Sequence, residues 1–246
     1  MSYEPLSYSK HKDLRLTRGT FFYLDNKPCV PISIVEAPRA ALDLPMAFAG
    51  TQKGLSLVTI LSLDKEDNAH VGPKGLWMGG YIPVVVRAHP FALAYQEDKA
   101  VLIVDSESDW LSQTEGQPLF EADGSKSQAV ERLVTLLRNQ APNPNRENPV
   151  LQAIEASGVL KQWPDAFEEL QQVDPQALAG LGAEDFLNLR DNNALPVLYA
   201  QLMSMPRLNR IKNFAQRKQK MVENQNPEPD INQLFGNQDV ISFDNM

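Results

Sequence analysis

Six basic side chains with no acidic residue between them form the least ordinary chemical pattern in this chain. They are Arg207, Arg210, Lys212, Arg217, Lys218 and Lys220. Leu208, Ile211 and Phe214 recur among them at three-residue spacing, which is typical of one face of a helix. Such a helix could bind an acidic protein, a nucleic acid or an anionic membrane, or it could pack on the acidic body of its own chain.

A second group of candidates combines aromatic rings with an arginine and two acids. Its members are Trp77, Tyr81, Arg87, Phe91, Asp105 and Glu115. Because a guanidinium can hold a carboxylate through two parallel hydrogen bonds, Arg87 is the strongest single candidate for contact with a ligand or a partner. The structural alternative is that the rings pack in the core and that Arg87 holds the loop around Asp105.

Recognisable catalytic and metal-binding motifs are absent from the sequence. His11, His70 and His89 do not occur at metal-ligand spacing, and the glycines form no phosphate-binding pattern. No Gly-x-Ser-x-Gly motif is present, and the acidic run at 105–109 lacks the glycine and distal glutamate of a calcium loop. We therefore expect no metal and no cofactor, and the sequence favours a binding protein over an enzyme.

Composition indicates a globular protein that folds without covalent cross-links. The chain has 246 residues, of which 43% are hydrophobic, and a formal net charge of -8. This acidic balance argues against broad nucleic-acid binding. The single cysteine, Cys29, excludes an internal disulfide and lies in an apolar stretch, where we expect a buried, inert thiol. With no signal peptide and no apolar run of about 18 residues, we expect a soluble, cytoplasmic protein without a transmembrane segment.

The first half of the chain has the pattern of a β-rich unit. Apolar runs bounded by turn residues predict strands at 20–24, 30–35, 46–49, 55–61, 81–86, 91–95 and 100–104, with a short helix at 36–42. Pro31 favours an edge strand, and Gly79 with Gly80 predicts a tight bend or bulge because glycine permits unusual backbone angles. The short connections predict an antiparallel roll or partly open barrel over residues 1–122.

Helical periodicity takes over near residue 123. A capping box at 125–128 predicts a helix that ends near Gln140, and later helices are predicted to begin at Asn148-Pro149 and Asp174-Pro175 and to cover 183–189 and 193–205. We expect residues 123–215 to pack on the β-rich part in one compact α+β unit. Residues 206–220 should be partly helical, and we place a flexible tail at 216–246.

The tail contains sparse apolar residues in a polar background. They are Ile231, Leu234, Phe235, Val240, Ile241 and Phe243. Anchors of this kind suit a short segment that docks into a groove on another chain or on a second copy of the same chain. Self-association through the tail is one hypothesis, and simple disorder is the other.

The run from Gly75 to Phe91 resembles the central signature of the SapC-like family. Segments 30–33, 45–48, 112–120, 173–175 and 198–205 fit other parts of the family pattern, so the resemblance covers roughly residues 3–215. The family's name implies an association with bacterial surface layers. The resemblance also implies partners, because relatives are often encoded beside flavin-dependent tryptophan-halogenase-like proteins, cupin-like oxygenases and outer-membrane receptors. It supplies no catalytic residues.

Three functions are consistent with these observations. The first is a non-enzymatic SapC-like accessory protein that binds another protein, such as the flavoprotein or oxygenase encoded nearby. The second is a small-ligand-binding protein or enzyme that uses the region of Trp77, Tyr81 and Arg87. The third is a surface-layer protein. A cavity that Trp77, Tyr81 and Arg87 share with Asp105 or Glu115 would favour the second.

Overall fold

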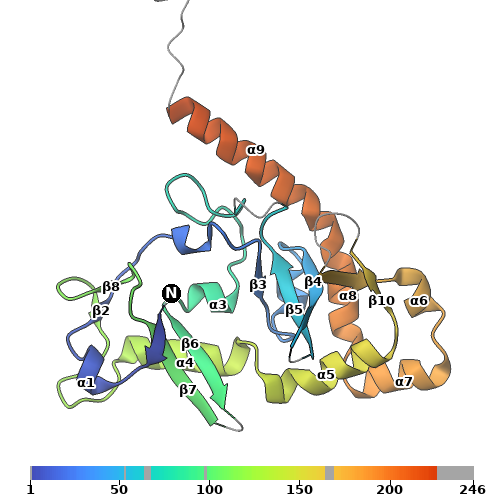
Figure 1. The fold of residues 1–246 in the computed structure, drawn as a ribbon, viewed down its shortest axis with the longest axis horizontal. Helices are drawn as coiled ribbons and strands as arrows, with labels where there is room; N and C mark the ends of the chain where they lie inside the picture. The colour runs from blue at the N-terminus through green and yellow to red at the C-terminus, as the bar shows by residue number, and fades with distance from the viewer. Residues whose placement is uncertain (1, 53, 64–67, 97–98, 164–168, 226–246) are drawn as a thin grey trace, which may run out of the picture.

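The computed structural model describes residues 2–52, 54–63, 68–96, 99–163 and 169–225, and it shows an α+β protein (Figure 1). The largest sheet has five strands, all antiparallel, in the order β10-β11-β4-β5-β3. The strands are β3 (Cys29–Pro31), β4 (Met46–Thr51), β5 (Gly54–Ile60), β10 (Leu160–Gln162) and β11 (Leu170–Val173).

Both faces of this central sheet are buried. Met46, Ala47 and Phe48 in β4 are fully buried, although successive side chains of a strand point to opposite faces. Met46 and Phe48 belong to one hydrophobic cluster and Ala47 to another. A sheet covered on both sides explains why β4 and β5 are nearly continuous apolar runs without alternation.

Helices from the second half of the chain cover the face of Phe48. These are α5 (Pro144–Ala156), α6 (Pro175–Ala179), α7 (Ala183–Asp191) and α8 (Leu195–Ser204), joined by the short α2 (Ala37–Ala40). Ile154 of α5 and Leu198 of α8 are fully buried in the same cluster as Phe48. The helices therefore bury their apolar sides on the sheet.

The start of α9 (Leu208–Gln225) covers the opposite face. A 3-10 helix, η2 (Met205–Arg207), leads into it from α8. Ile211 and Phe214 join Ala47, Val58 and Ile60 in one buried cluster. The far end of the helix projects past the outline of the body (Figure 1).

A second lobe contains two smaller antiparallel sheets. One has the order β1-β7-β6, from β1 (Tyr3–Pro5), β6 (Phe91–Gln96) and β7 (Lys99–Asp105), and the other has β8 (Leu111–Ser112), β2 (Arg15–Leu16) and β9 (Gln117–Pro118) in the order β8-β2-β9. The helices here are α1 (Tyr8–His11), η1 (Phe22–Leu24), α3 (Val84–Arg87) and α4 (Gln128–Gln140). Val84, Phe91, Val104 and Val130 share its core.

The α+β class, both predicted hairpins and most predicted helices are confirmed. The runs at 46–49 and 55–61 form the β4–β5 hairpin, and those at 91–95 and 100–104 form β6–β7. β3 is an edge strand, as Pro31 predicted. In the described residues the strands form three separate sheets and no closed barrel.

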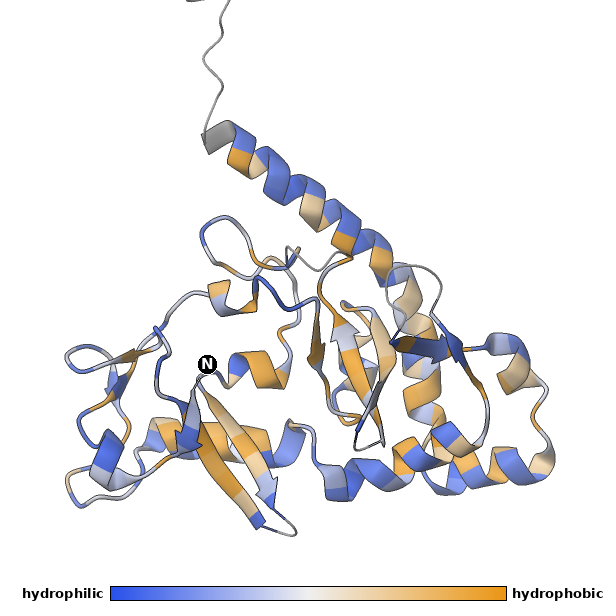
Figure 2. Ribbon diagram, in the orientation of Figure 1, coloured by the Kyte–Doolittle hydropathy of each residue, from blue (hydrophilic) through white to orange (hydrophobic). Residues whose placement is uncertain are grey.

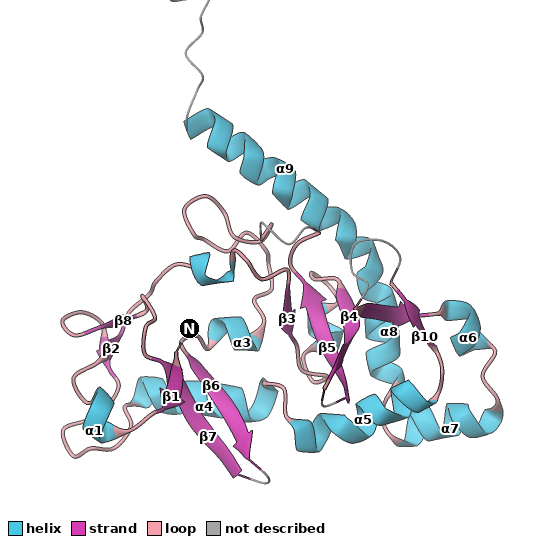
Figure 3. Cartoon of the chain, in the orientation of Figure 1, coloured by secondary structure: helices cyan, strands magenta, loops and turns pink. Residues whose placement is uncertain are grey.

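Two predicted strands are wrong (Figure 3). Residues 81–86 form an extended entry followed by α3, and residues 20–24 form a bend and the 3-10 helix η1. In both runs the β-branched or aromatic residues suggested strands. Their side chains instead enter a core between elements: Leu24 and Val86 belong to the same buried cluster.

The second half also differs in detail from the prediction. Helix α4 is capped by Ser127, not Ser125, and α5 begins at Pro144 after its cap Asn143, so Pro149 lies inside it. The hairpin β10–β11 was not predicted. Helix α9 continues through Gln225, past the predicted start of the tail at 216, and residues 226–246 lie outside the described residues.

Candidate functional site

Tyr81 is held by four side chains from two segments of the chain, residues 36–43 and α3. Its hydroxyl donates to Glu36 Oε1 at 2.7 Å, and its backbone N–H donates to Asp43 Oδ2 at 2.5 Å. The guanidinium carbons of Arg39 and Arg87 lie 5.8 and 5.6 Å from the ring centroid, within cation–π range. Burial and the neighbouring Glu36 raise the pKa of Tyr81 well above its ordinary value.

The carboxylate of Glu36 is buried and accepts three hydrogen bonds. Besides the Tyr81 hydroxyl, the backbone N–H groups of Val84 and Ser33 donate to it at 2.8 and 3.4 Å. Burial raises its pKa and outweighs these hydrogen bonds and the nearby Arg87, which act in the opposite direction. Glu36 therefore fixes the start of α3 against the turn at 33–36.

A second buried carboxylate holds the same turn from the other side. Glu147, in the first turn of α5, accepts from Ser33 Oγ at 2.6 Å and from the Ile34 N–H at 3.2 Å, and Arg146 lies 3.7 Å away. Burial raises the pKa of Glu147. The two glutamates thus act as structural acceptors that link α3 and α5 to one turn.

Asp43 connects the Tyr81 segment to α9. One carboxylate oxygen accepts from the Tyr81 N–H, and the other pairs with Arg210 Nη1. A Cβ atom at Gly80 would lie 3.0 Å from Asp43 Oδ2, so glycine allows this close approach. Of the six predicted cations, Arg210 therefore forms an ion pair within the protein itself.

An aromatic row forms a second connection to α9. Trp77 donates from Nε1 to the Tyr81 carbonyl at 3.1 Å, and its ring lies 5.1 Å from that of His70. The His70 ring in turn meets Phe214 edge-on at 5.1 Å. Burial lowers the pKa of His70 to about 4, so this imidazole is neutral at pH 7 and packs as an aromatic ring.

The predicted bend at Gly79 and Gly80 is confirmed, but for a different reason. Neither glycine has a positive φ. A Cβ at Gly79 would lie 2.8 Å from Trp77 Nε1, just as one at Gly80 would crowd Asp43. Close packing, not backbone angle, favours glycine at both positions.

Of the predicted aromatic and acidic candidates, the structure brings together only Trp77, Tyr81 and Arg87. Arg87 lies against Tyr81 and is not seen to bond Asp105; Asp105 Oδ1 accepts from the Ser2 N–H at 2.8 Å. Phe91 is in the core of the second lobe. Glu115 is exposed between β8 and β9. None of the described cavities is lined by Tyr81 or Arg87 together with Asp105 or Glu115.

The six predicted cations divide into two sets. Arg210 faces Asp43, Lys218 donates to the Asn68 carbonyl at 3.4 Å, and Arg207 is partly buried in η2. Lys212, Arg217 and Lys220 are exposed, and no ion pair with the described part of the chain holds them. Figure 2 shows that the projecting part of α9 is mostly hydrophilic with a few apolar bands.

A hollow of about 350 Å³ lies beside this exposed part of α9. It is lined by Gly72, Pro73, Lys74, Leu76, Met78 and Met221. Leu76 and Met221 are 61% and 47% exposed and line the same hollow, so two exposed apolar side chains lie together there. We define the α9 docking surface as Arg217, Lys220, Met221 and Leu76, and leave out Lys212, which lies on the opposite side of the helix from Met221.

Sequence reasoning found the cations of this surface and missed its apolar part. Leu76 lies inside the signature run, but an isolated leucine in a loop gives no sign of exposure. Met221 falls at the point where the sequence becomes polar and was assigned to the tail. Asp43 was also missed, because its two partners are 38 and 167 residues away in the chain.

Metal sites and membrane spans were searched for in the same residues. Within the described ranges, no three His, Cys, Asp or Glu side chains group as metal ligands would. No described helix has both the length and the apolar character needed to cross a membrane.

Comparison with known proteins gives one result. No curated protein and no solved structure matches this chain. The model of the SapC family, however, matches residues 6–211, which include Tyr81, Asp43 and the first turn of α9. The chain therefore belongs to the SapC family.

Proposed function

We propose that this protein is an accessory protein that binds another protein through the α9 docking surface. The observation that carries the proposal is the division of α9. Its first two turns are part of the core through Ile211 and Phe214, whereas its later turns expose cations and apolar side chains. A helix fixed at one end presents its free end at small entropic cost, which favours binding.

The chemistry of the surface indicates an acidic partner. The whole chain carries a formal charge of -8, so two exposed cations side by side, Arg217 and Lys220, are a local exception. Opposite charge on the partner speeds encounter and selects orientation. The hollow beside Met221 would accept an apolar side chain of the partner, and such buried anchors supply most of the binding free energy in interfaces.

The resemblance to the SapC-like family suggests which proteins to test first. These are the flavin-dependent tryptophan-halogenase-like protein and the cupin-like oxygenase encoded nearby. In this proposal the α9 docking surface contributes binding and takes no part in chemistry.

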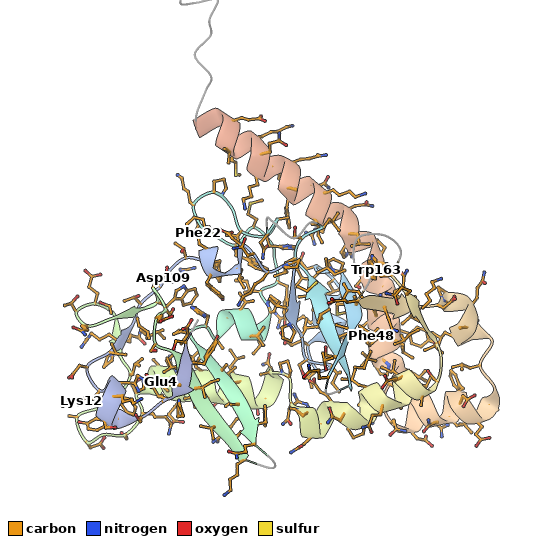
Figure 4. All side chains as sticks on the ribbon, in the orientation of Figure 1. Glu4, Lys12, Phe22, Phe48, Asp109 and Trp163 are labelled. Atoms are coloured by element: carbon orange, nitrogen blue, oxygen red, sulfur yellow. The ribbon has the colours of Figure 1, made fainter. Side chains whose placement is uncertain are left out.

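Charge reversal tests the electrostatic part of the proposal. Each neighbour-encoded protein is titrated calorimetrically with the native chain, with Arg217→Glu/Lys220→Glu and with Lys12→Glu/Arg18→Glu. The last variant changes charge equally at exposed residues of the other lobe (Lys12 is labelled in Figure 4). We expect the α9 variant to bind about 10-fold more weakly, with a smaller salt dependence, and the control variant to bind like the native chain.

Polar substitution tests the hollow. Leu76→Ser and Met221→Ser should speed dissociation, whereas Leu42→Ser should not, although Leu42 is 68% exposed. If Leu76→Ser and Met221→Ser dissociate at the same rate as the control Leu42→Ser, binding does not use α9. If neither candidate protein binds the native chain, this choice of partner is wrong.

A further inference from the structure

A polar hollow in the second lobe, separate from α9, contains a serine and a histidine in contact. Its volume is about 370 Å³, and it is lined by Thr20, Phe22, Tyr23, His89, Asp105, Glu107, Ser108 and Asp109. Three chain segments meet here: the approach to η1, the turn after α3 and the end of β7. Phe22 and Asp109 are labelled in Figure 4 and mark the place.

Ser108 and His89 have the geometry of a nucleophile and its base. Ser108 Oγ lies 2.7 Å from His89 Nε2. The backbone N–H of Trp110 donates to the same Ser108 oxygen at 3.1 Å. The Trp110 N–H occupies one lone pair of the serine oxygen and leaves the hydroxyl hydrogen free to turn toward Nε2, which accepts it in the Nδ1–H tautomer of the neutral imidazole.

Two aromatic residues fix the imidazole. Tyr23 stacks on it with ring centroids 3.8 Å apart and an interplanar angle of 13°, and Trp110 meets it edge-on at 5.4 Å. Both aromatic side chains are themselves held by hydrogen bonds, from the Tyr23 hydroxyl to the Val86 carbonyl and from Trp110 Nε1 to the Thr20 carbonyl. The base is therefore preorganised, as catalysis requires.

Burial keeps His89 in the neutral form, which can accept a proton. Burial lowers the pKa of His89 to about 4, while Asp105 and Asp109 act in the opposite direction and the cation Lys27 adds to the lowering. The imidazole is thus neutral at pH 7, and the two carboxylates would stabilise the imidazolium formed when it takes a proton.

We propose that Ser108 is a nucleophile, with His89 as its general base, toward small esters and thioesters without negative charge. Ser108 Oγ bonds to the carbonyl carbon as its proton moves to His89 Nε2. The bond to the alcohol or thiol then breaks, and the leaving group takes that proton. Water attacks the acyl-serine, again through His89, and releases the carboxylic acid.

The lining of the hollow sets the class of substrate. Three carboxylates, those of Asp105, Glu107 and Asp109, disfavour an anionic molecule and favour a cationic one. The volume is near the lower end of the range for ligand pockets, which limits the substrate to a small acyl group and a small leaving group.

The first experiment needs no variant. The full chain is treated with a fluorophosphonate, whose P–F bond breaks as a serine Oγ–P bond forms, and the modified peptide is identified by mass spectrometry. We expect a single adduct on Ser108. An absence of adduct on Ser108 overturns the proposal.

Variants and substrates then test the roles. Ser108→Ala should abolish labelling and hydrolysis, and His89→Gln should slow both about 100-fold. Ser106→Ala, at an exposed serine two residues away, should label like the native chain.

The charge preference is tested with two thioesters. Acetylthiocholine should be hydrolysed faster than S-acetylthioglycolate. Equal labelling of His89→Gln, or preference for the anionic thioester, contradicts the proposal. No partner protein takes part, so failure here leaves the α9 proposal unaffected.

Discussion

Asp43 shows how one side chain can join two segments that are far apart in the sequence. Its two oxygens hold the backbone of Tyr81 and the guanidinium of Arg210, so the signature segment and the basic helix share one acceptor. The side chain is only 15% exposed. Without it, the partly buried Tyr81 N–H would lose its acceptor, and Arg210, whose side chain is 42% exposed, would lose its ion pair.

Replacing Asp43 should therefore destabilise the fold. We expect Asp43→Ala to lower the free energy of unfolding by about 2 kcal/mol, because a hydrogen bond to a charged group is lost and Arg210 is left partly buried. Urea unfolding measures this. Asp191→Ala removes the partner of Arg190 at an exposed pair and should change stability by less than about 0.5 kcal/mol. Equal effects would mean that the Asp43 contacts add little.

The buried glutamates give a second prediction, on pH. The pKa of Glu36 and Glu147 in the folded protein lies above the ordinary 4.5, so between these values the folded state binds more protons than the unfolded state. Stability must then fall as pH rises through that interval. Glu36→Gln/Glu147→Gln removes both groups, and the variant's unfolding free energy should decline less steeply with pH. Parallel curves would show that the carboxylates titrate normally.

At the scale of elements, the hydrophobic pattern of the sequence predicted the hairpins and helices that depend on residues close together in the chain. The β4–β5 and β6–β7 hairpins have two apolar runs close in sequence, and α4 and α8 have a clear apolar side. The failures have physical causes. Val84, Val85 and Val86 form a helix because Glu36 accepts a hydrogen bond from the Val84 N–H and because Val84 and Val86 are buried. β10 and β11 are polar strands whose pairing depends on a distant neighbour, β4.

The same limit applies to the candidate site. The basic residues were visible as a run, and Trp77, Tyr81 and Arg87 as a segment. Which cations face inward depends on Asp43 and Asn68, and contacts over such distances along the chain have no local signal. The pairing of His89 with Ser108 likewise arises only when the turn after α3 meets the end of β7.

Helix α9 should have two halves of different energetic character. We expect Ile211→Ala or Phe214→Ala to lower the free energy of unfolding by about 2–4 kcal/mol, because each leaves a cavity against the central sheet. Met221→Ala should change it by less than about 0.5 kcal/mol. Urea unfolding of the three variants tests this. A large effect at Met221 would show that the end of α9 belongs to the core.

At the scale of the molecule, charge is distributed unevenly between the two-lobed body and helix α9. Two lobes form the body, and α9 extends from one of them as a cationic projection on an acidic protein (Figure 1). The body buries its apolar surface in four clusters, none of which includes a residue beyond Phe214 in the described part of α9. Folding and association should therefore be separable.

Truncation tests that separation. Deleting residues 222–246 removes the end of α9 and the segment that follows, and we expect the thermal midpoint to stay nearly unchanged while affinity for the partner, or for a second copy, falls. Calorimetry and analytical ultracentrifugation give the two readouts. If the shortened chain unfolds, the C-terminal segment contributes to the core and the predicted boundary is wrong.

The pairing of β4 with β11 has a consequence for biosynthesis. β4 gains β5 as a neighbour almost as soon as it leaves the ribosome, but its other edge waits for Leu170 and Gln171, after residues 52–169 have been added. At ordinary translation rates that interval is on the order of ten seconds. During this interval, the nascent chain exposes one edge of the apolar strand β4, with its N–H and C=O groups unpaired. A co-translational chaperone should therefore bind this chain until the β10–β11 hairpin has emerged.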